Sequence, residues 1–378
     1  MSTVCLNMIV KNESHVIRRC LESVRPFIDH WVIVDTGSTD GTQETIREFL
    51  REVPGELHER PWKNFGHNRT EALELAREKA DYLFVIDADE VLEAVSGFSW
   101  PPLVAGGYHI QVSSGPVTYA RKALVSNRLK WRYEGVLHEY IICDIPHTQE
   151  DIEGIWVRVY HDGGRSQIDP VEKFLRDAHI LEEALKTEPD NPRYVFYLAQ
   201  SYRDSNQPEK ALEIYRRRAE MGGWVEEVWY SLYEMARLSE VLRLDSTIIR
   251  DRYLQAYQYR PSRAESLGQL ARYCREQEQF ALAHLFARQG LEIPLSHDLL
   301  FRDDSFSQWR CLDEYSIACY WIGEYAESER ICRRLLNGGR LPREQVERVL
   351  ANLNWSLRQQ GRPEETLGGN QISQGPKM

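Results

Sequence analysis

The sequence predicts an α/β domain built on a mostly parallel sheet, followed by an all-α domain of helical repeats. Strand and helix patterns alternate along residues 3–90, which is typical of βαβ units. From about residue 169, helical patterns fill the chain almost without interruption. A length of 378 residues is sufficient for two domains. We therefore expect one domain over residues 1–165, a second over 166–366 and a disordered tail over 367–378.

Short apolar runs mark the strands of the first domain. Runs of this kind, bounded by turn-forming residues, are typical of strands that are buried on both faces. Apolar residues at helical spacing fill the segments between them. The expected strands are residues 3–10, 31–34, 57–60 and 82–86, with a helix in each interval. After Glu90, runs at 107–113, 117–125 and 154–160 predict a smaller mixed sheet or hairpin region.

The second domain repeats in sequence. Leu198-Ala199 aligns with Leu270-Ala271, 72 residues later, and small or aromatic residues follow both pairs at similar offsets. This separation equals two periods of about 36 residues, close to the period of tetratricopeptide repeats. The pattern resembles those repeats, in which pairs of helices stack, although the repeat tryptophan and glycine are mostly missing. Prolines at 192, 261 and 294 lie between the predicted repeats.

Composition narrows the classes of protein to consider. The net charge is −11 and neither half of the chain is basic, so we expect no bulk attraction to nucleic acid. No segment approaches the ~18 consecutive apolar residues of a membrane span. The first 13 residues resemble a strand rather than a signal peptide. Seven scattered cysteines without a C-x-x-C pair predict free thiols, a cytoplasmic location and no zinc site.

A cluster of carboxylates follows the strand at 82–86. Asp87, Asp89 and Glu90 come directly after it. In open α/β sheets, ligands bind at the carboxyl ends of the strands. Carboxylates crowded there repel one another unless a cation is present, and Mg²⁺ or Mn²⁺ binds carboxylate oxygens and often also substrate phosphates. The cluster therefore predicts a metal–diphosphate site, the alternative being a solvated acidic turn.

Asp35 follows the strand at 31–34 and is expected at the same edge of the sheet. Its carboxylate could accept a hydrogen bond from a ribose hydroxyl or a base nitrogen. The alternative is that Asp35 and the polar residues after it cap the next helix, and for Ser38–Thr42 we favour capping. The chain lacks both a G-x-G-x-x-G dinucleotide motif after the first strand and a G-K-[ST] phosphate loop.

Further side chains suit the same chemistry. Arg69 lies near a helix N-terminus, a place that favours a diphosphate, or it is a solvated cation. His161 follows an apolar strand and could complete a carboxylate-rich Mn²⁺ site, or it could be structural. Glu139 could act as a general base, and Glu134 competes for that role. Either could instead be a paired or exposed carboxylate.

Together these segments resemble family 2 glycosyltransferases of the GT-A fold. The matching blocks, in order, are NMIVKNE (7–13), VDTGSTDGT (34–42), NR (68–69), IDADE (86–90), VLHE (136–139) and His161. They cover about residues 4–165. The helical repeats resemble the tail of one branch of these enzymes, which includes bacterial peptide and protein glycosyltransferases. The Q-x-x-R-W block of processive synthases is absent, which argues against polymer synthesis at a membrane.

The resemblance implies a role for each matching residue. On the donor side, Val10 and Glu13 would lie beside the nucleotide base, and Asp35 would bond the base or ribose. Asn68 and Arg69 would lie at the diphosphate.

The resemblance also implies the positions of the metal and the base. Asp87 would contact the ribose or the waters of the metal. Asp89 and His161 would ligate Mn²⁺ or Mg²⁺. Glu139 would activate the acceptor.

These roles imply an inverting, metal-dependent glycosyltransferase that uses a nucleotide sugar, a UDP-sugar being the expected donor. Direct attack by an acceptor that is deprotonated on the opposite face of the sugar inverts the anomeric centre. The repeats would bind a peptide, protein or other large acceptor, or hold a homodimer together. Two alternatives stay open: a non-catalytic repeat scaffold with a vestigial nucleotide-sugar domain, and a transferase acting on nucleic-acid bases. The acidic charge of both halves weighs against the second.

Overall fold

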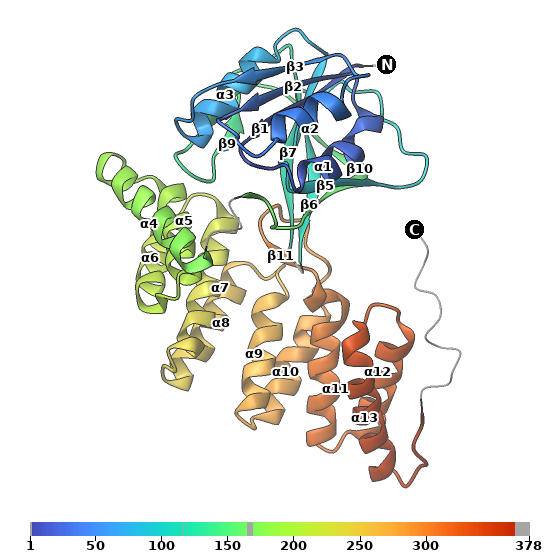
Figure 1. The fold of residues 1–378 in the computed structure, drawn as a ribbon. Coiled ribbons are helices and arrows are strands. Elements are labelled where there is room, and N and C mark those ends of the chain that lie inside the picture. The colour runs from blue at the N-terminus through green and yellow to red at the C-terminus, as the bar shows by residue number, and fades with distance from the viewer. Residues whose placement is uncertain (1, 116, 165–168, 367–378) are drawn as a thin grey trace. The chain divides into compact units, whose positions relative to one another are not determined.

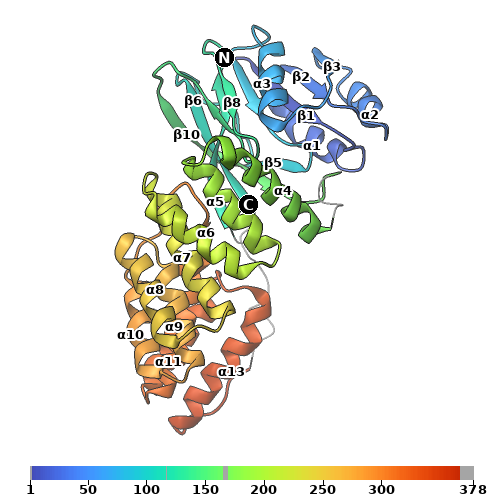
Figure 2. The same cartoon turned by 90° about the vertical axis from the view of Figure 1, so that its left-hand side faces the viewer.

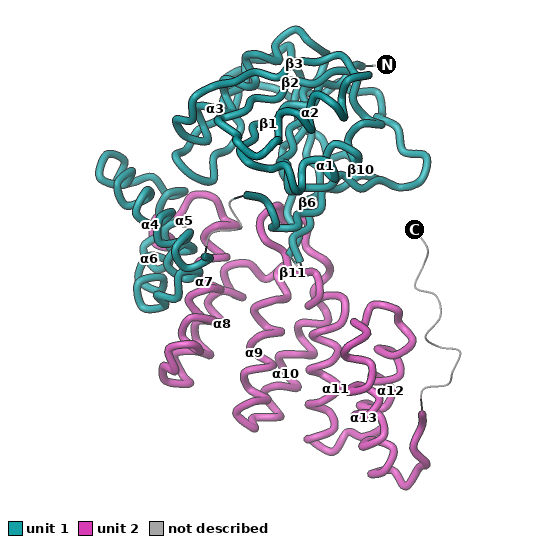
Figure 3. Tube along the Cα trace, viewed as in Figure 1, with its two compact units in different colours: residues 1–217 teal, residues 218–378 magenta. Residues whose placement is uncertain are grey.

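The computed structural model describes residues 2–115, 117–164 and 169–366, which form two compact units (Figures 1 and 3). Unit 1 covers residues 1–217 and unit 2 covers 218–378. The predicted fold class, a mostly parallel sheet followed by a region of helical repeats, is confirmed. The boundary between the units lies within helix α6 (Pro208–Glu220), so the first helices of the helical region belong to unit 1. The tail predicted for 367–378 lies outside the described residues.

The sheet of unit 1 has the strand order β3-β2-β1-β4-β7-β6-β10-β5. Strands β3, β2, β1 and β4 run parallel, as predicted, and β10 runs parallel to β6. Strand β7 is antiparallel to β4 and β6, and β5 is antiparallel to β10. The strands are β1 (Val4–Val10), β2 (His30–Asp35), β3 (Gly55–Glu59), β4 (Tyr82–Val85), β5 (Glu90–Ala94), β6 (Gly107–Ser114), β7 (Val117–Ser126) and β10 (Gln149–Val159).

Apolar side chains on both faces of the central strands explain why these strands appear as unbroken apolar runs. On β1, Leu6 and Met8 belong to one buried cluster with helix α1, whereas Cys5 points into a second cluster with helix α3. The helices of this part are α1 (Ile17–Val24), the 3-10 turn η1 (Arg25–Phe27), α2 (Thr42–Phe49) and α3 (Phe65–Leu75). The predicted helix in each interval between strands is therefore present.

Two features of the sheet region differ from the prediction. The strand expected at 82–86 ends at Val85, and Glu90 begins β5, so Asp87 and Asp89 lie in the turn between them. A hairpin of β8 (Arg132–Glu134) and β9 (Tyr140–Ile142) was also missed. Each of its strands has three residues, too few to show a period of two.

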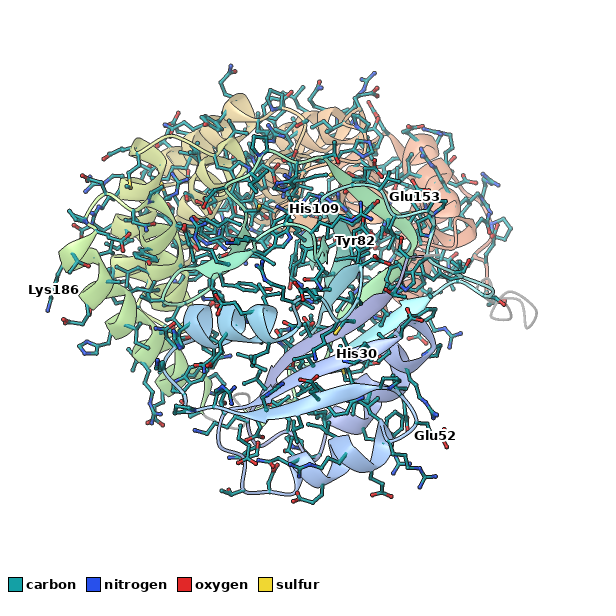
Figure 4. All side chains as sticks on the ribbon, turned by 90° about the horizontal axis from the view of Figure 1, so that it is seen from above. His30, Glu52, Tyr82, His109, Glu153 and Lys186 are labelled. Carbon is teal, nitrogen blue, oxygen red and sulfur yellow. The ribbon has the colours of Figure 1, made fainter. Side chains whose placement is uncertain are left out.

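The amino edge of the sheet has a cavity of about 1230 Å³ lined in part by Phe27, Tyr82 and Trp100. His30 and Tyr82 begin β2 and β4 (Figure 4). This cavity therefore lies at the opposite end of the strands from the residues predicted to bind a ligand.

Three helices complete unit 1: α4 (Pro170–Thr187), α5 (Pro192–Asp204) and α6. Helices α4 and α5 lie side by side (Figure 2). Both begin with proline at the first helical position, where its missing N–H costs nothing. The Asp169 carboxylate caps α4, and the Asn191 side chain accepts hydrogen bonds from two backbone N–H groups of α5.

Unit 2 is helical in its described part, apart from the two-residue strand β11 (Arg302–Asp303). Its other elements are α7 (Val225–Val241), α8 (Ser246–Tyr259), α9 (Glu265–Glu276), α10 (Phe280–Leu291), the π-helical turn η3 (Phe306–Arg310), α11 (Cys311–Trp321), α12 (Tyr325–Asn337) and α13 (Arg343–Gln359). Consecutive helices pack on one another. The small residues at the repeated positions, such as Ala271, Cys274, Ala283 and Ala287, are fully buried, as the repeat pattern predicts.

A buried charge network joins the start of α9 to the loop after α10. The Arg263 guanidinium is fully buried and pairs with the carboxylates of Glu265 and Asp298. It also donates to the carbonyl oxygens of Leu300 and Phe301. Its charge lies 3.7 Å from the centre of the Trp229 ring. These partners offset the cost of burying the guanidinium.

All seven cysteines are free, as predicted, and six of them are buried. In the part of the chain that the structure describes, no helix has the length and apolar character needed to cross a membrane.

Candidate active site

The carboxyl ends of three parallel strands meet at one edge of the sheet in unit 1. Strand β1 lies between β2 and β4. Val10 at the end of β1 pairs with Asp35 at the end of β2, and Asn7 pairs with Val85 at the end of β4. The sheet therefore brings Val10, Asp35 and the turn after β4 to the same edge, as predicted.

Asp35 is fully buried at this edge. Its Oδ1 accepts hydrogen bonds from the backbone N–H groups of Gly37 and Ser38, both at 2.8 Å. Its Oδ2 is buried and has no hydrogen-bond partner in the described part of the chain. A buried acceptor without a partner costs free energy, which a ligand that donates a hydrogen bond would recover.

The polar loop after β2 holds the loop after β1, and this corrects the capping interpretation. Ser38 Oγ accepts from the Asn12 N–H, and Thr42 Oγ1 accepts from the Glu13 N–H, each at 2.8 Å. Asp40 accepts from Ser14 N–H at 3.0 Å and also from Thr42 at the start of α2. The N-cap of α2 itself is Gly41, with a φ of 89° and no side-chain cap. Capping alone was wrong because most of these side chains bind residues 12–14.

Glu13 lies on that held loop and reaches the segment after β10. Both of its carboxylate oxygens accept from the Gly164 N–H, at 3.0 and 3.1 Å. Burial raises the pKa of Glu13 to about 7, and the negative charge of Asp89 adds to this rise. Val10, the other residue predicted beside the base, is buried, and its carbonyl oxygen accepts from Thr36.

The raised pKa of Glu13 predicts a pH-dependent stability. Between the ordinary Glu pKa of about 4.5 and about 7, the folded state binds more protons than the unfolded state, so the free energy of unfolding falls as pH rises. Glu13→Gln removes this loss. As the pH rises from 5 to 7.5, the free energy of unfolding of the variant should therefore gain about 1–2 kcal/mol relative to that of wild type, allowing for the partial exposure of Glu13. Urea unfolding in EDTA measures it. Glu44→Gln, an exposed control on α2, should show no such gain; equal curves for both variants would contradict the prediction.

Asp87 and Asp89 lie in the turn between β4 and β5 and differ in their surroundings. Burial opposes the ionisation of Asp87, but the positive charges of Arg69 and Arg121 outweigh it and lower the pKa of Asp87. Burial raises the pKa of Asp89, and the charge of Asp87 raises it further. Within the described residues, no other side chain forms a hydrogen bond or ion pair with the Asp89 carboxylate, so it is the one that a cation would stabilise most.

The segment after β10 packs against Asp89. His161 has a φ of 54°, and its Nε2 lies 2.7 Å from Ser114 Oγ. A positive charge on His161 would lower the pKa of Asp89, so the two predicted ligands lie within electrostatic reach of each other. A Cβ on Gly163 would lie 3.0 Å from Asp89 Cβ, so any larger residue at this position would have to displace Asp89 by a few tenths of an ångström. One carboxylate and one imidazole suit Mn²⁺ or Mg²⁺ when diphosphate oxygens and water supply the other ligands.

Arg69 joins two carboxylates that are far apart in the sequence. Its Nη2 donates to Asp87 Oδ1 at 2.7 Å and its Nε donates to Glu139 Oε1 at 2.6 Å. The Arg69 and Glu139 side chains are 12% and 11% exposed, so the ion pair is largely screened from water. The guanidinium predicted at the diphosphate is therefore paired with the carboxylates of Asp87 and Glu139.

Glu134 lies in a different setting from Glu139. Its carboxylate pairs with Arg132 at 2.7 Å and accepts from the Tyr140 hydroxyl, within the β8–β9 hairpin. Its side chain is 42% exposed. Of the two candidate bases, Glu139 is the one that lies beside Asp87, through Arg69.

Asn68, predicted near the diphosphate, is fully buried, and its amide holds the chain before α3. Its Oδ1 accepts from the Lys63 N–H at 2.9 Å and its Nδ2 donates to the Pro61 carbonyl at 3.1 Å. Two positions earlier, Gly66 lets α3 approach the hairpin region closely. A Cβ there would lie 2.9 Å from the Gly135 carbonyl oxygen.

We expect Gly66→Ala to destabilise unit 1 by about 1–3 kcal/mol, because the added methyl group must push α3 away from the backbone at residue 135. The gain in helix propensity, about 1 kcal/mol, offsets part of this strain. Urea unfolding followed by circular dichroism measures the change. Glu74→Ala, at an exposed site on the same helix, is the control and should stay within about 0.5 kcal/mol. A stabilised Gly66→Ala variant would contradict the close approach.

An ion pair beside the site was missed. Arg121 on β7 forms a two-bonded ion pair with Glu90, at 2.8 and 2.6 Å, and the Glu90 side chain is 4% exposed. Glu90 therefore has a protein partner. The sequence shows Arg121 only as an arginine within a strand-like run. Such a run does not indicate that the partner of this arginine is Glu90, 31 residues away.

Another group of possible metal-binding side chains lies in unit 2. In the described part of the chain, His284, Cys319 and Glu324 have ligand atoms within 4.8 Å of one another. Burial raises the pKa of the Cys319 thiol to about 12. The group is not part of the sheet edge described above.

The comparison with protein families matches the part of unit 1 that carries this sheet edge. Residues 5–94 match the model described as glycosyl transferase family 2. Unit 1 carries a family 2 glycosyltransferase domain. The predicted family is thus confirmed. The matched range of this glycosyltransferase domain includes Asp35, Arg69 and Asp89 but ends before Glu139 and His161.

Curated relatives include both glycosyltransferases and repeat proteins. The chain is 25% identical over 229 residues to the SPbeta prophage-derived glycosyltransferase SunS of Bacillus subtilis, covering 57% of this chain and 53% of the relative. It is 32% identical over 104 residues to the lipopolysaccharide core biosynthesis glycosyltransferase LpsC of Rhizobium meliloti, covering 27% and 37%. A TPR repeat-containing protein of Synechococcus elongatus is 26% identical over 310 residues, covering 77% and 75%. The chain thus spans about half the length of the SunS relative.

Proposed function

We propose that this chain is an inverting, metal-dependent glycosyltransferase that transfers a sugar from a UDP-sugar to a peptide, protein or other large acceptor. The observation that carries the proposal is the meeting, at one sheet edge, of an unpartnered Asp35 oxygen and the Asp89 carboxylate. Arg69 brings Glu139 to the same edge. The family match supports glycosyl transfer, whereas the donor, the metal and the acceptor are inferred from the chemistry of the residues.

The donor nucleotide would bind along the loops after β1 and β2. Asp35 Oδ2 would accept a hydrogen bond from the base or ribose, because a carboxylate is an acceptor only. Val10 and Glu13 line the neighbouring loop. Arg69 and its neighbour Asn68 would lie toward the diphosphate, and Asp87 would lie toward the ribose. Asn68 would also fix the start of α3.

Asp89 and His161 would hold a divalent cation, which when bound stabilises the negative charge that builds on the diphosphate leaving group. Glu139 would take the proton from the acceptor hydroxyl or thiol as it attacks the sugar. The Arg69 guanidinium, 2.6 Å from Glu139, fixes this carboxylate in place before the reaction. The acceptor attacks the face opposite the leaving group, which inverts the anomeric centre.

The helical repeats would bind the acceptor or a second copy of the chain. The free cysteines fit a reaction in the cytoplasm. The name of the LpsC relative points to a second acceptor class, a lipopolysaccharide core, which a peptide panel would not cover.

A donor screen tests the proposal. Purified chain is incubated with Mn²⁺ and a panel of UDP-, GDP-, CDP- and TDP-sugars, and release of the nucleoside diphosphate is measured with and without EDTA. We expect slow hydrolysis of one or a few UDP-sugars that EDTA stops. Tight binding of UDP with no turnover of any donor would favour a binding scaffold, and a mobility shift on duplex DNA at low salt would favour a nucleic-acid substrate.

A further inference from the structure

Helix α5 contacts the segment that carries Glu139. The Arg193 guanidinium donates from Nε and Nη2 to the His138 carbonyl oxygen, at 2.9 and 2.8 Å. It also lies 4.8 Å from the centre of the Tyr140 ring. One side chain of α5 therefore holds both residues that flank Glu139.

Neighbouring residues of α5 hold the same segment. The Tyr197 ring stacks on the His138 ring, with centroids 3.8 Å apart and an interplanar angle of 6°. The Tyr197 ring also lies against Arg193, whose guanidinium is 5.0 Å from the centre of that ring. Because Asn191 caps this first turn of α5, these side chains project from a fixed backbone.

The backbone of the segment needs such support. His138 has a φ of 51°, in the left-handed region that residues other than glycine adopt only where the surrounding structure holds them. The carbonyl oxygen of this strained residue is the one that Arg193 binds. Glu139 comes next in the chain, so a change in the conformation of His138 would redirect the Glu139 side chain.

The contacts form a continuous path into the site. Arg193 binds the backbone of His138. The next residue in the chain, Glu139, binds Arg69 at 2.6 Å. Arg69 in turn binds Asp87 at 2.7 Å, in the turn that also carries Asp89. Each step is a direct hydrogen bond or a peptide link within unit 1.

We propose that Arg193 is a positioning residue that sets the place of the Glu139 carboxylate, so that helix α5 completes the glycosyltransferase site. The expected effect of Arg193 on turnover rests on the proposed function, whereas its expected effect on the order of residues 136–142 does not. The two parts can therefore be measured separately.

The test compares Arg193→Ala with Arg216→Ala, an exposed arginine on α6, in the full chain. Hydrogen exchange of the amides at 136–142 should be about tenfold faster in Arg193→Ala and unchanged in the control. With the nucleotide sugar that wild type turns over, kcat should fall about 10- to 100-fold, while KM for the donor stays within about twofold. This split is expected because Arg193 acts on Glu139 and not on the donor.

Two further variants guard against general unfolding of α5. Arg193→Lys keeps a single donor for the His138 carbonyl and should recover part of kcat. Tyr197→Leu removes the ring stack on His138 and the contact of the Tyr197 ring with Arg193, but it keeps the arginine as donor to the His138 carbonyl, so it should lower kcat less than Arg193→Ala. Wild-type exchange rates or a kcat within twofold in Arg193→Ala would overturn the proposal. If wild type turns over no donor, the proposed function fails, and the exchange rates alone decide whether Arg193 holds the segment.

Discussion

Replacing Asp89 with asparagine is expected to lower nucleotide-sugar turnover about 100- to 1000-fold at saturating donor. Asparagine keeps the shape of the side chain and one oxygen, but it removes the charge that would hold a divalent cation. The apparent affinity for Mn²⁺ should fall as well. Both quantities follow from measuring the release of nucleoside diphosphate while Mn²⁺ is titrated.

The same substitution should leave the fold intact. Burial and the charge of Asp87 raise the pKa of Asp89, so its ionised form is disfavoured in the folded state and a neutral amide should not lower the stability. Asp151→Asn is the control, since the Asp151 side chain is 76% exposed on β10. Turnover of Asp89→Asn within threefold of wild type, at unchanged Mn²⁺ affinity, would exclude Asp89 as a metal ligand.

Replacing Arg263 with alanine is expected to destabilise unit 2 by about 3–5 kcal/mol. The substitution leaves the Glu265 carboxylate, 7% exposed, without a cation, and leaves Asp298, 5% exposed, with Arg260 as its remaining cation. It also removes donors from two backbone carbonyl oxygens and the charge above the Trp229 ring. Urea unfolding followed by tryptophan fluorescence measures the loss.

Lysine at this position should recover little of the stability. Arg263 reaches its two carboxylates and two carbonyls with the planar fork of a guanidinium, which a single ammonium group cannot match. Arg340→Ala, at an exposed site in the same unit, is the control and should cost less than about 0.5 kcal/mol. Similar losses in Arg263→Ala and Arg340→Ala would show that the buried network contributes little net stability.

The central sheet could be predicted because its strands are buried on both faces, which leaves a clear mark in the sequence. Residues 4–10 and 30–35 are examples, and the small residues of unit 2 gave a similar signal at their repeat spacing. Strand β5 left no such mark, since it contains Glu90 and Glu93, whose charges are matched by arginines on β7 and β10. A strand that depends on cross-strand ion pairs does not show an apolar pattern.

The candidate site was predictable where position along a strand decides position in space. Asp35 ends strand β2 and Asp87 follows strand β4, so their shared edge could be predicted from sheet topology. The partners of Arg69 could not be predicted in this way, because Glu139 is 70 residues away and comes from a hairpin with strands of three residues. The contact of Arg193 with a backbone carbonyl also leaves no residue pattern, since every residue has a carbonyl.

The unpartnered oxygen of Asp35 has a consequence for which nucleotides the protein distinguishes. A buried carboxylate oxygen favours a ligand edge that presents an N–H and opposes one that presents a lone pair. Uracil and guanine carry a ring N–H on their pairing edges, whereas cytosine and adenine carry a bare ring nitrogen there. A site built to accept a hydrogen bond discriminates strongly against an analogue that lacks the donor. With the ring nitrogen of the base at this oxygen, UDP and GDP should therefore compete for the site. CDP and ADP, which can donate there only from their exocyclic amines, should bind more weakly through the change at one atom rather than through the shape of the base.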